Sequence, residues 1–355
     1  MARVDMANGI YRIGIVGASS LVGKELSDEL GESLLGAGNF VLLDDNDVAG
    51  QITATGDEAA FIQRLEPSSF DRMDFVFFAG SAEVTKKHWQ NARRAGASIV
   101  DLTYALEREK DVLARAPWVG EALASKAAQS GKKLDLNTPA VVAGHPAAVM
   151  LALVAARLQS KLPLKSVAAT VMEPASENGR AAMDELHQQT VNLLSFQTLP
   201  REQYDAQVAF NLLPSLGDAA KIKLAVTEKR IREQYAEFSD GLLPPLAIQV
   251  IQSPVFHGYV MSMLVEVAQS ATVEQVEAAL AGEHIDVARG ESDPPSNLSA
   301  AGQEDIMVRV SEDVGGDGVT RFWLWLAADN LKLAALNAID CAGELRRFRP
   351  LGKVQ

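Results

Sequence analysis

The chain of 355 residues is poor in cysteine and has no long uninterrupted apolar segment. Its single cysteine, Cys341, excludes an intrachain disulfide and a disulfide-stapled secreted scaffold, so we expect a reducing, cytoplasmic location. The most apolar stretch, residues 141–158, is broken by Gly144, His145 and Pro146 and is too short to span a bilayer. The N-terminal sequence MARVDMANG lacks the apolar region of a signal peptide.

Positive charge is also scarce. There are 33 Lys and Arg residues against 46 Asp and Glu residues, which gives a formal net charge of −13. Such a chain repels phosphate backbones and anionic lipids, so we expect neither nucleic acid nor membrane surfaces as partners. The hydrophobic fraction of 48% is enough for two domains of moderate size.

The first part of the chain alternates apolar runs with amphipathic segments. Strands are predicted at residues 11–16, 40–43, 75–78 and 98–102, and helices at residues 22–30 and 84–95. Near-continuous apolar strands alternating with helices are typical of a Rossmann-like, doubly wound parallel sheet. We therefore predict an α/β nucleotide-binding domain that comprises residues 8–145 and 328–350.

After Pro146 the pattern changes to strands separated by hairpins and long excursions. This predicts a second, α+β domain, residues 146–327, with a mainly antiparallel sheet. The predicted strand 321–326 places Trp323 and Trp325 on one face and apolar residues on the other, so one face could contact another subunit, although aromatic pairs on strands are also ordinary core. The final helix, 330–346, should return to cover the first domain.

Small residues follow two of the predicted strands at the same edge of the sheet. Glycine-rich turns of this kind let backbone N–H groups approach a pyrophosphate at a helix N-terminus. Ser20 stands where the usual fingerprint has its middle glycine, so a turn without a ligand is an equal alternative. Asp44 and Asp45 follow the second strand and favour NAD over NADP, unless they form only a solvated turn. The predicted cofactor-binding residues here are Gly17, Ser19, Ser20, Leu21, Val22, Asp44, Ala79, Gly80 and Ser81.

Seven segments, in one order, resemble the aspartate-semialdehyde dehydrogenase family. They are GIVGASSLVG (14–23), FFAGSAEV (77–84), IVDLTYALE (99–107), SENGRAAMDEL (176–186), AFNLLPSLG (209–217), SPVFHG (253–258) and DNLKLAALNAI (329–339). The resemblance covers nearly the whole chain. It implies a homodimer with an NAD(P)-binding domain and with a dimerisation domain, residues 146–327, inserted before the last helix. It also adds Asn330 to the predicted cofactor-binding residues.

The same resemblance shows that this chain differs from the family at the catalytic and substrate-binding positions. His145 takes the place of the catalytic cysteine and Tyr259 that of the acid–base histidine. Gln252 and Glu107 replace the arginines that meet the substrate carboxylate and the phosphate, and Glu173 replaces a glutamine ahead of the S-G-A-G turn. The sequence therefore indicates a divergent branch without the family's nucleophile.

Aldehyde oxidation in this family needs a thiolate that holds the substrate covalently while hydride leaves. Cys341 is predicted to lie within a helix as inert core, and no residues are spaced as metal ligands. We therefore favour a binding or regulatory relative without dehydrogenase activity. One alternative is an NADH-dependent oxidoreductase in which His145, His257 or Tyr259 protonates an alkoxide. A remaining alternative is an active semialdehyde dehydrogenase with a misassigned cysteine. His145 and His257 could instead be hydrogen-bonded packing residues without a catalytic role.

Overall fold

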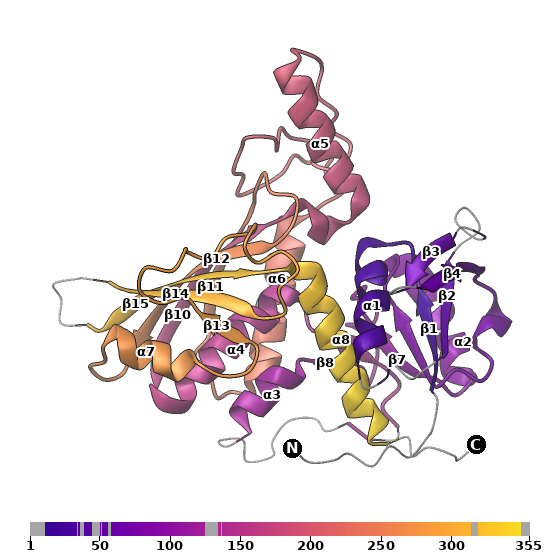
Figure 1. Cartoon of the computed structure of the whole chain (residues 1–355), viewed down its shortest axis with the longest axis horizontal. Coiled ribbons are helices and arrows are strands. Elements are labelled where there is room, and N and C mark those ends of the chain that lie inside the picture. Colours follow the sequence, from indigo (N-terminus) through magenta and orange to yellow (C-terminus); the bar gives the residue numbers. More distant parts are fainter. Residues whose placement is uncertain are drawn as a thin grey trace. The chain divides into compact units, whose positions relative to one another are not determined.

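The computed structural model describes residues 11–33, 35, 39–44, 50, 52–55, 58–124, 134–135, 137–313 and 319–348. They form two compact units, which are coloured along the chain in Figure 1. The first unit contains residues 1–115, 132–143 and 335–355, and the second contains residues 116–131 and 144–334. Residues 116–131, which we predicted within the first domain, thus group with the second unit. Residues 8–10 and 349–350 of the predicted ranges lie outside the described residues.

The first unit is built on a seven-stranded sheet whose paired strands are all parallel. Its order is β5-β2-β1-β6-β7-β9-β8. The strands are β1 (Arg12–Val16), β2 (Asn39–Asp44), β5 (Gln63–Arg64), β6 (Phe75–Phe78), β7 (Ser98–Asp101), β8 (Leu113–Arg115) and β9 (Val141–Ala143). All four residues of β6 are buried, as both-sided coverage of a parallel sheet requires. The Rossmann-like prediction is confirmed.

Helices α1 (Leu21–Glu32) and α2 (Ala82–Arg94) and a 3-10 turn, η1 (Pro67–Phe70), connect these strands. A hairpin of β3 (Ile52–Thr55) and β4 (Glu58–Phe61) was not predicted. Its four-residue strands are too short to give a clear alternating pattern.

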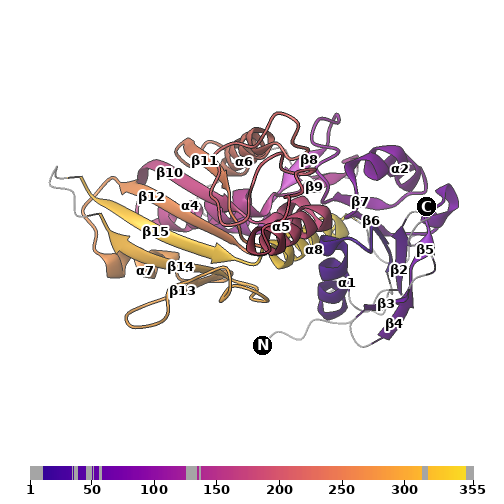
Figure 2. The same cartoon turned by 90° about the horizontal axis from the view of Figure 1, so that it is seen from above.

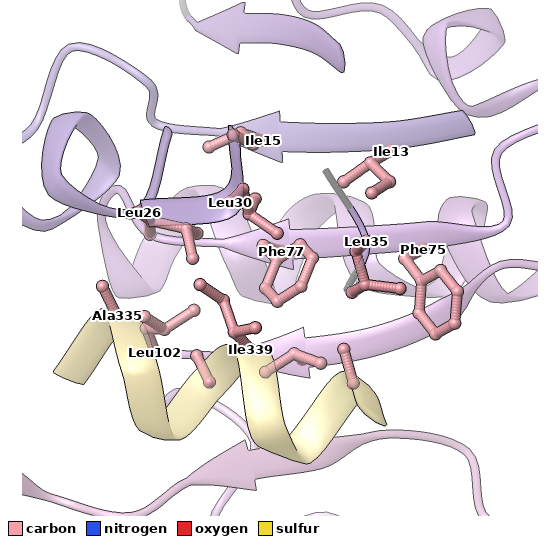
Figure 3. Packing of buried hydrophobic residues seen from close by; sticks show 14 of the residues in the cluster. Ile13, Ile15, Leu26, Leu30, Leu35, Phe75, Phe77, Leu102, Ala335 and Ile339 are labelled. Carbon is pink, nitrogen blue, oxygen red and sulfur yellow. The ribbon is translucent and has the colours of Figure 1, made fainter. Parts of the chain in front are cut away.

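The last helix, α8 (Asn330–Arg346), begins in the second unit and continues into the first. Its residues Ala335 and Ile339 pack in the core of the first unit with Leu26 and Phe77, as Figure 3 shows. The predicted return of this helix, with the same bounds, is confirmed. Its alanines allow the close approach to the sheet.

The second unit contains a six-stranded sheet of order β11-β10-β12-β15-β14-β13. The strands are β10 (Leu164–Glu173), β11 (Leu246–Gln252), β12 (Tyr259–Val267), β13 (Ile285–Val287), β14 (Ile306–Glu312) and β15 (Arg321–Ala328). Pairs β10–β12, β12–β15 and β14–β15 are antiparallel, whereas β10–β11 and β13–β14 are parallel. The sheet is therefore mixed. Residues 174–245, which contain helices, return the chain parallel from β10 to β11, and the loop of residues 288–305 does so from β13 to β14.

Helices α4 (Pro146–Lys161) and α7 (Val273–Leu280) lie on one side of this sheet, and α3 (Pro117–Leu123) and α6 (Leu224–Ser239) pack with α4. On β15, Phe322, Leu324 and Leu326 are fully buried, whereas Trp323 and Trp325 are 41% and 37% exposed. The two tryptophans therefore mark the opposite face, which we call the open face of the sheet.

Helix α5 (Arg180–Leu194) follows a 3-10 turn, η2 (Ala175–Asn178), and rises from the side of the sheet opposite α4 and α7 (Figures 1 and 2). We call α5 with the following residues 195–222 the α5 arm. Among the described residues, no helix combines the length and apolarity needed to cross a membrane.

Candidate functional site

The turn after β1 ends at a capped helix. Ser20 is the N-cap of α1, where its Oγ accepts a hydrogen bond from the Gly23 N–H at 2.9 Å and donates one to the Ala79 carbonyl at 2.7 Å. Ser20 therefore ties the two predicted nucleotide turns together. The first turn of α1 carries no acidic residue, so its leading N–H groups, from Leu21 and Val22, can attract an anion.

Glycine is required in these turns because their backbones touch. A Cβ on Gly17 would lie 2.2 Å from the Gly80 Cα, and a Cβ on Gly23 would lie 2.2 Å from the Gly17 carbonyl oxygen. Gly17 also has a φ of 83°. A dinucleotide-binding turn needs such a close approach of its backbones. The Ser20 side chain does not block the turn, because it forms the N-cap of α1.

Asp44 ends β2 beside the same turn. Its Oδ2 accepts a hydrogen bond from the Ser19 N–H at 2.9 Å, so the half-buried carboxylate is held in place. An acid at this position can accept hydrogen bonds from a ribose hydroxyl and repels a 2′-phosphate. Asp45 lies outside the described residues.

The second turn and the following loop complete this edge of the sheet. Ser81 is the N-cap of α2 and its Oγ accepts from the Val84 N–H at 3.3 Å. At the end of β7, burial raises the pKa of Asp101, hydrogen bonds from Thr103 and Leu106 oppose this shift, and the negative charge of Glu107 adds to it. Glu107 thus brings negative charge to the loop that follows β7.

A second group of polar residues lies within the second unit, and we call it the polar cluster. It is formed by the residues His145, Glu173, Ser176, Glu177, Asn178, Thr227, Arg230, Gln234, Gln252, Tyr259 and Asn330. They come from the ends of β10 and β11, from η2, from one face of α6 and from the first residues of α4, β12 and α8. Both predicted catalytic positions, His145 and Tyr259, belong to this cluster, as do the predicted substrate-site positions Glu173 and Gln252.

His145 is the N-cap of α4 and is 1% exposed. Its Nδ1 accepts a hydrogen bond from the Ala147 N–H at 3.2 Å, and its Nε2 lies 3.1 Å from Oε1 of Glu177. Its backbone N–H donates to the Gln234 side chain at 2.7 Å. An Nδ1 that accepts is unprotonated, so in this arrangement Nε2 carries the hydrogen and donates to the carboxylate. Neither ring nitrogen is left for a substrate.

Glu177 is held from two sides. Burial would raise its pKa, but His145, the hydrogen bond from Asn330 and the charge of Arg230 together hold the pKa below its usual value. The Asn330 Nδ2 donates to Glu177 Oε2 at 3.2 Å, and the Asn330 Oδ1 accepts from the Ser176 hydroxyl and the Gly258 N–H. We predicted that Asn330 contacts the cofactor. In the structure its side chain forms hydrogen bonds within the second unit.

Glu173 is the last residue of β10 and is fully buried. Burial raises its pKa to about 8, with a further contribution from the charge of Glu177, although hydrogen bonds from Asn178 and Thr227 oppose the shift. The bond from the Asn178 Nδ2 measures 2.7 Å. At neutral pH this carboxyl group is therefore mostly protonated.

Gln252 pairs with Glu173 across the parallel strands β10 and β11. Its Nε2 donates to the carbonyls of Glu173 and Ser253, each at 3.1 Å. Tyr259 begins β12, is fully buried, and has its ring centroid 6.0 Å from that of His145. The structure thus brings together His145, Glu173, Gln252 and Tyr259, whereas Glu107 belongs to the first unit.

Two residues of α6, which the sequence did not single out, also belong to the cluster. Thr227 and Arg230 lie close enough to Glu173 to lower its pKa. Glu228, the neighbour of Thr227, pairs with Arg232 at 2.7 Å instead of entering the cluster. The buried face of α6, which includes Thr227, Ile231 and Gln234, is the signal in the sequence that could have found Thr227.

Cys341 lies within α8 and is fully buried in the core of the first unit. Its Sγ lies 3.6 Å from the Arg115 carbonyl oxygen, and burial raises the pKa of the thiol well above its usual value. A thiol in this state forms no thiolate near neutral pH and is unreactive. In the part of the chain that the structure describes, no group of three or more His, Cys, Asp or Glu side chains is placed to hold a metal ion.

Comparisons with known proteins give a consistent result. Residues 12–126 match the family description "Semialdehyde dehydrogenase, NAD binding domain", and residues 155–333 match "Semialdehyde dehydrogenase, dimerisation domain". The chain is 31% identical over 336 residues to a USG-1 protein homolog of Pseudomonas aeruginosa, covering 94% of this chain and 96% of that protein. It is 26% identical to an aspartate-semialdehyde dehydrogenase of Rickettsia bellii, covering 94% of this chain and 97% of that protein. The structure of a probable aspartate-semialdehyde dehydrogenase from Pseudomonas aeruginosa superimposes with a TM-score of 0.80 at 29% identity, covering 96% of this chain and 99% of that one.

Proposed function

The chain belongs to the semialdehyde dehydrogenase family, and from this premise we propose that it is a dinucleotide-binding homodimer without the thiol-dependent dehydrogenase reaction, acting as a binding or regulatory relative. The observation that carries the proposal is the burial of its only thiol, Cys341, in the core of the first unit. We assign nucleotide binding to residues 8–145 and 328–350, and dimerisation to residues 146–327.

The reaction excluded by this proposal needs a nucleophile that forms a covalent adduct from which hydride departs. His145 is a poor substitute because both of its ring nitrogens are bonded within the chain. Glu177 adds a carboxylate 3.1 Å from the Nε2 of His145. The place of attack is therefore filled by the chain's own side chains.

Substrate binding is altered as well. A substrate with a carboxylate and a co-substrate phosphate need cationic partners, and at the two positions given by the resemblance this chain has Gln252 and Glu107. Gln252 hydrogen-bonds to backbone carbonyls instead of reaching an anion. Glutamate in place of arginine reverses the sign of the interaction, at a cost of order several kcal/mol when desolvated.

The residues of the first unit fit a nicotinamide dinucleotide. The N–H groups of Leu21 and Val22 would hold the pyrophosphate, and Asp44 would accept hydrogen bonds from the adenosine ribose, which supports NAD over NADP. When bound, such a cofactor supplies hydride transfer. The chain's own residues would orient it, and the burial of Cys341 leaves no sulfur nucleophile for aldehyde oxidation.

Homodimerisation is supported by the match of residues 155–333 to a dimerisation domain and by the open face of the second sheet. Trp323 and Trp325 expose large aromatic surfaces there, and aromatic residues are enriched in subunit interfaces. One cysteine per chain is also in keeping with a cytoplasmic protein.

One observation favours a second candidate, a carbonyl reductase that needs no thiol. The protonated Glu173 and the His145–Glu177 pair, with Tyr259 beside them, place proton donors in one cluster. A reductase of this kind needs NADH as the hydride donor and a group that protonates the carbonyl oxygen, and it needs no thiol. The burial of His145 and Tyr259 argues against access and makes this the second choice.

Two measurements separate these functions. Calorimetry with NADH and NADPH should give binding of NADH, and assays with aspartate semialdehyde, phosphate and NAD or NADP should give no turnover. Phosphate-dependent oxidation by the unaltered protein would overturn the proposal. NADH consumption with simple aldehydes or ketones would favour the reductase.

A further inference from the structure

The carboxylate of Glu177 is bound by side chains that come from other elements of the second unit. Its Oε1 lies 3.1 Å from the Nε2 of His145, and its Oε2 accepts a hydrogen bond from the Asn330 Nδ2 at 3.2 Å. His145 and Asn330 are each 1% exposed. One buried donor therefore faces each carboxylate oxygen, which is the arrangement found where proteins bind carboxylates.

The two donors are oriented by hydrogen bonds that do not involve Glu177. The Nδ1 of His145 accepts from the Ala147 N–H at 3.2 Å, so the ring hydrogen is on Nε2 and points at the carboxylate. The Oδ1 of Asn330 accepts from the Gly258 N–H at 3.1 Å, which leaves the Nδ2 turned toward Glu177. The first residues of α4 and α8 thus present a preorganised pair of donors.

The charges of the polar cluster also favour one anion at this place. At neutral pH Glu173 is mostly protonated, because burial raises its pKa to about 8. Against the effect of burial, His145 and the charge of Arg230 hold the pKa of Glu177 below its usual value, so Glu177 is ionised. Removal of the Glu177 carboxylate would leave the cluster with a net positive charge, and a monoanion would compensate it.

Glu177 itself comes from a short element at the edge of the cluster. It belongs to η2, a 3-10 turn of four residues without a side-chain cap at its start. The Glu177 side chain is 11% exposed, whereas that of His145 is 1% exposed, so solvent reaches the site from the Glu177 side. A change of the Glu177 side-chain torsions would therefore move the carboxylate into solvent and leave both donors in place.

We propose that His145, Asn330 and Arg230 form a binding site for a carboxylate ligand, and that Glu177 is an internal occupant that this ligand displaces. The inference rests on the proposed function, because it gives the ligand class of a binding relative. Neither donor stands at the position that the resemblance gives to the substrate carboxylate, which Gln252 occupies. Because Glu177 competes within the same chain at a high effective concentration, it keeps the site closed to weak ligands.

Glu177→Ala tests this site in the full chain, because the substitution removes a group of the size of acetate and leaves the donors. We expect acetate to bind the variant with a Kd of about 1 mM in calorimetry, as a ligand of this size allows. In about 100 mM acetate the Tm of the variant should be about 5 °C higher than in sodium chloride of the same ionic strength. Acetamide has the same shape without the charge and should not raise the Tm.

Three controls separate this binding from a general salt effect. The unaltered protein should show no acetate-specific rise in Tm, because Glu177 fills the site. Glu202→Ala is the matched variant, since it removes an exposed glutamate of the α5 arm, and it should behave like the unaltered protein. Asn330→Asp, added to Glu177→Ala, keeps the acceptor for Gly258 but replaces the donor with a second acceptor. Acetate binding should then weaken more than about 10-fold.

A second variant keeps the test decisive if Glu177→Ala does not fold. Glu177→Gln preserves the volume of the side chain, but its amide offers one acceptor to two donors. Acetate should therefore displace the amide, with a Kd about 10-fold above that of Glu177→Ala. Recovery of folded Glu177→Ala by acetate, but not by acetamide, would also support the site.

The outcomes distinguish this inference from the proposed function. Acetate that binds neither Glu177 variant, or that still binds after Asn330→Asp, would overturn the carboxylate site and leave the dinucleotide-binding relative as proposed. An equal rise in Tm for the unaltered protein and Glu202→Ala would overturn the site as well. Phosphate-dependent oxidation of aspartate semialdehyde by the unaltered protein would overturn the proposed function, whereas saturable acetate binding confined to the Glu177 variants would still support the site.

Discussion

His145 and Glu177 form a buried pair, with the Nε2 of His145 3.1 Å from Oε1 of Glu177. The other ring nitrogen of His145 accepts the Ala147 N–H and caps α4. The imidazole therefore performs two structural tasks, because it caps α4 and pairs with Glu177. Protonation of Nδ1 would strengthen the attraction to Glu177 but would remove the helix cap, so the two tasks oppose each other.

This pair leads to a prediction about stability. His145→Ala removes the cap of α4, which is worth about 1 kcal/mol, and leaves Glu177 buried without its partner, which costs more. We expect the free energy of unfolding to fall by about 3 kcal/mol in urea denaturation. His187→Ala, on the exposed face of α5, is the control and should change it by less than about 0.5 kcal/mol. Equal stability of the two variants would mean that the pair does not stabilise the fold.

A second prediction concerns pH and Glu173. Its pKa is raised from 4.5 in the unfolded chain to about 8 in the folded protein. Between these values only the unfolded state is ionised, so rising pH from about 4.5 to 8 lowers the free energy of unfolding, which then levels off. Each pKa unit corresponds to about 1.4 kcal/mol, so the change is of order several kcal/mol.

Glu173→Gln should abolish this contribution, because an amide does not ionise and can still accept from Asn178. We expect the variant to match the unaltered protein near pH 4 and to be more stable at pH 8, by urea denaturation across this range. The control, Glu202→Gln, changes an exposed carboxylate and should follow the unaltered protein at every pH. A Glu173 variant whose stability never exceeds that of the unaltered protein would contradict the raised pKa.

The arrangement of the elements could largely be predicted from the sequence, because it depends on local patterns. Strand β6 is a continuous apolar run, and α8 has alanine and leucine at helical spacing, so both were assigned with the correct bounds. The parallel pairing of β10 with β11 was missed, since partners about eighty residues apart are not specified by the pattern of either strand. Short elements such as the β3–β4 hairpin also carry too little pattern.

The polar cluster was only partly predictable. His145 and Glu173 were identified by their place relative to the family's motifs, but the partner of His145 was not. Glu177 is an unremarkable polar residue in a turn, and its contact with a residue 32 positions earlier depends on the tertiary fold. Thr227 and Arg230 were not identified, because the sequence does not show which face of α6 is turned toward Glu173.

A third prediction concerns the choice of cofactor. Asp44→Ala removes the carboxylate expected to accept ribose hydrogen bonds and to repel a 2′-phosphate. We expect the affinity for NADH to fall about 10-fold and the preference of NADH over NADPH to shrink, as measured by calorimetry. Because Asp44 also accepts the Ser19 N–H, some stability should be lost. The control is Asp74→Ala, which removes the equivalent bond to the Arg12 N–H without touching the turn. Unchanged affinity for both dinucleotides in the Asp44 variant would count against its role.

The last prediction tests whether the absent nucleophile alone explains the absent activity. His145→Cys with Tyr259→His restores the thiol and the acid–base residue, yet we expect no measurable phosphate-dependent oxidation of aspartate semialdehyde. Gln252 and Glu107 still leave the substrate carboxylate and the phosphate without cationic partners, and Glu177 still occupies the position beside the thiol. Each unmet charge costs several kcal/mol, which corresponds to a factor of about 1,000 in kcat/KM. Adding Glu177→Gly, Gln252→Arg and Glu107→Arg should bring the activity into range. If the first two substitutions suffice, substrate binding was never lost, and only the missing sulfur separates this chain from an active dehydrogenase.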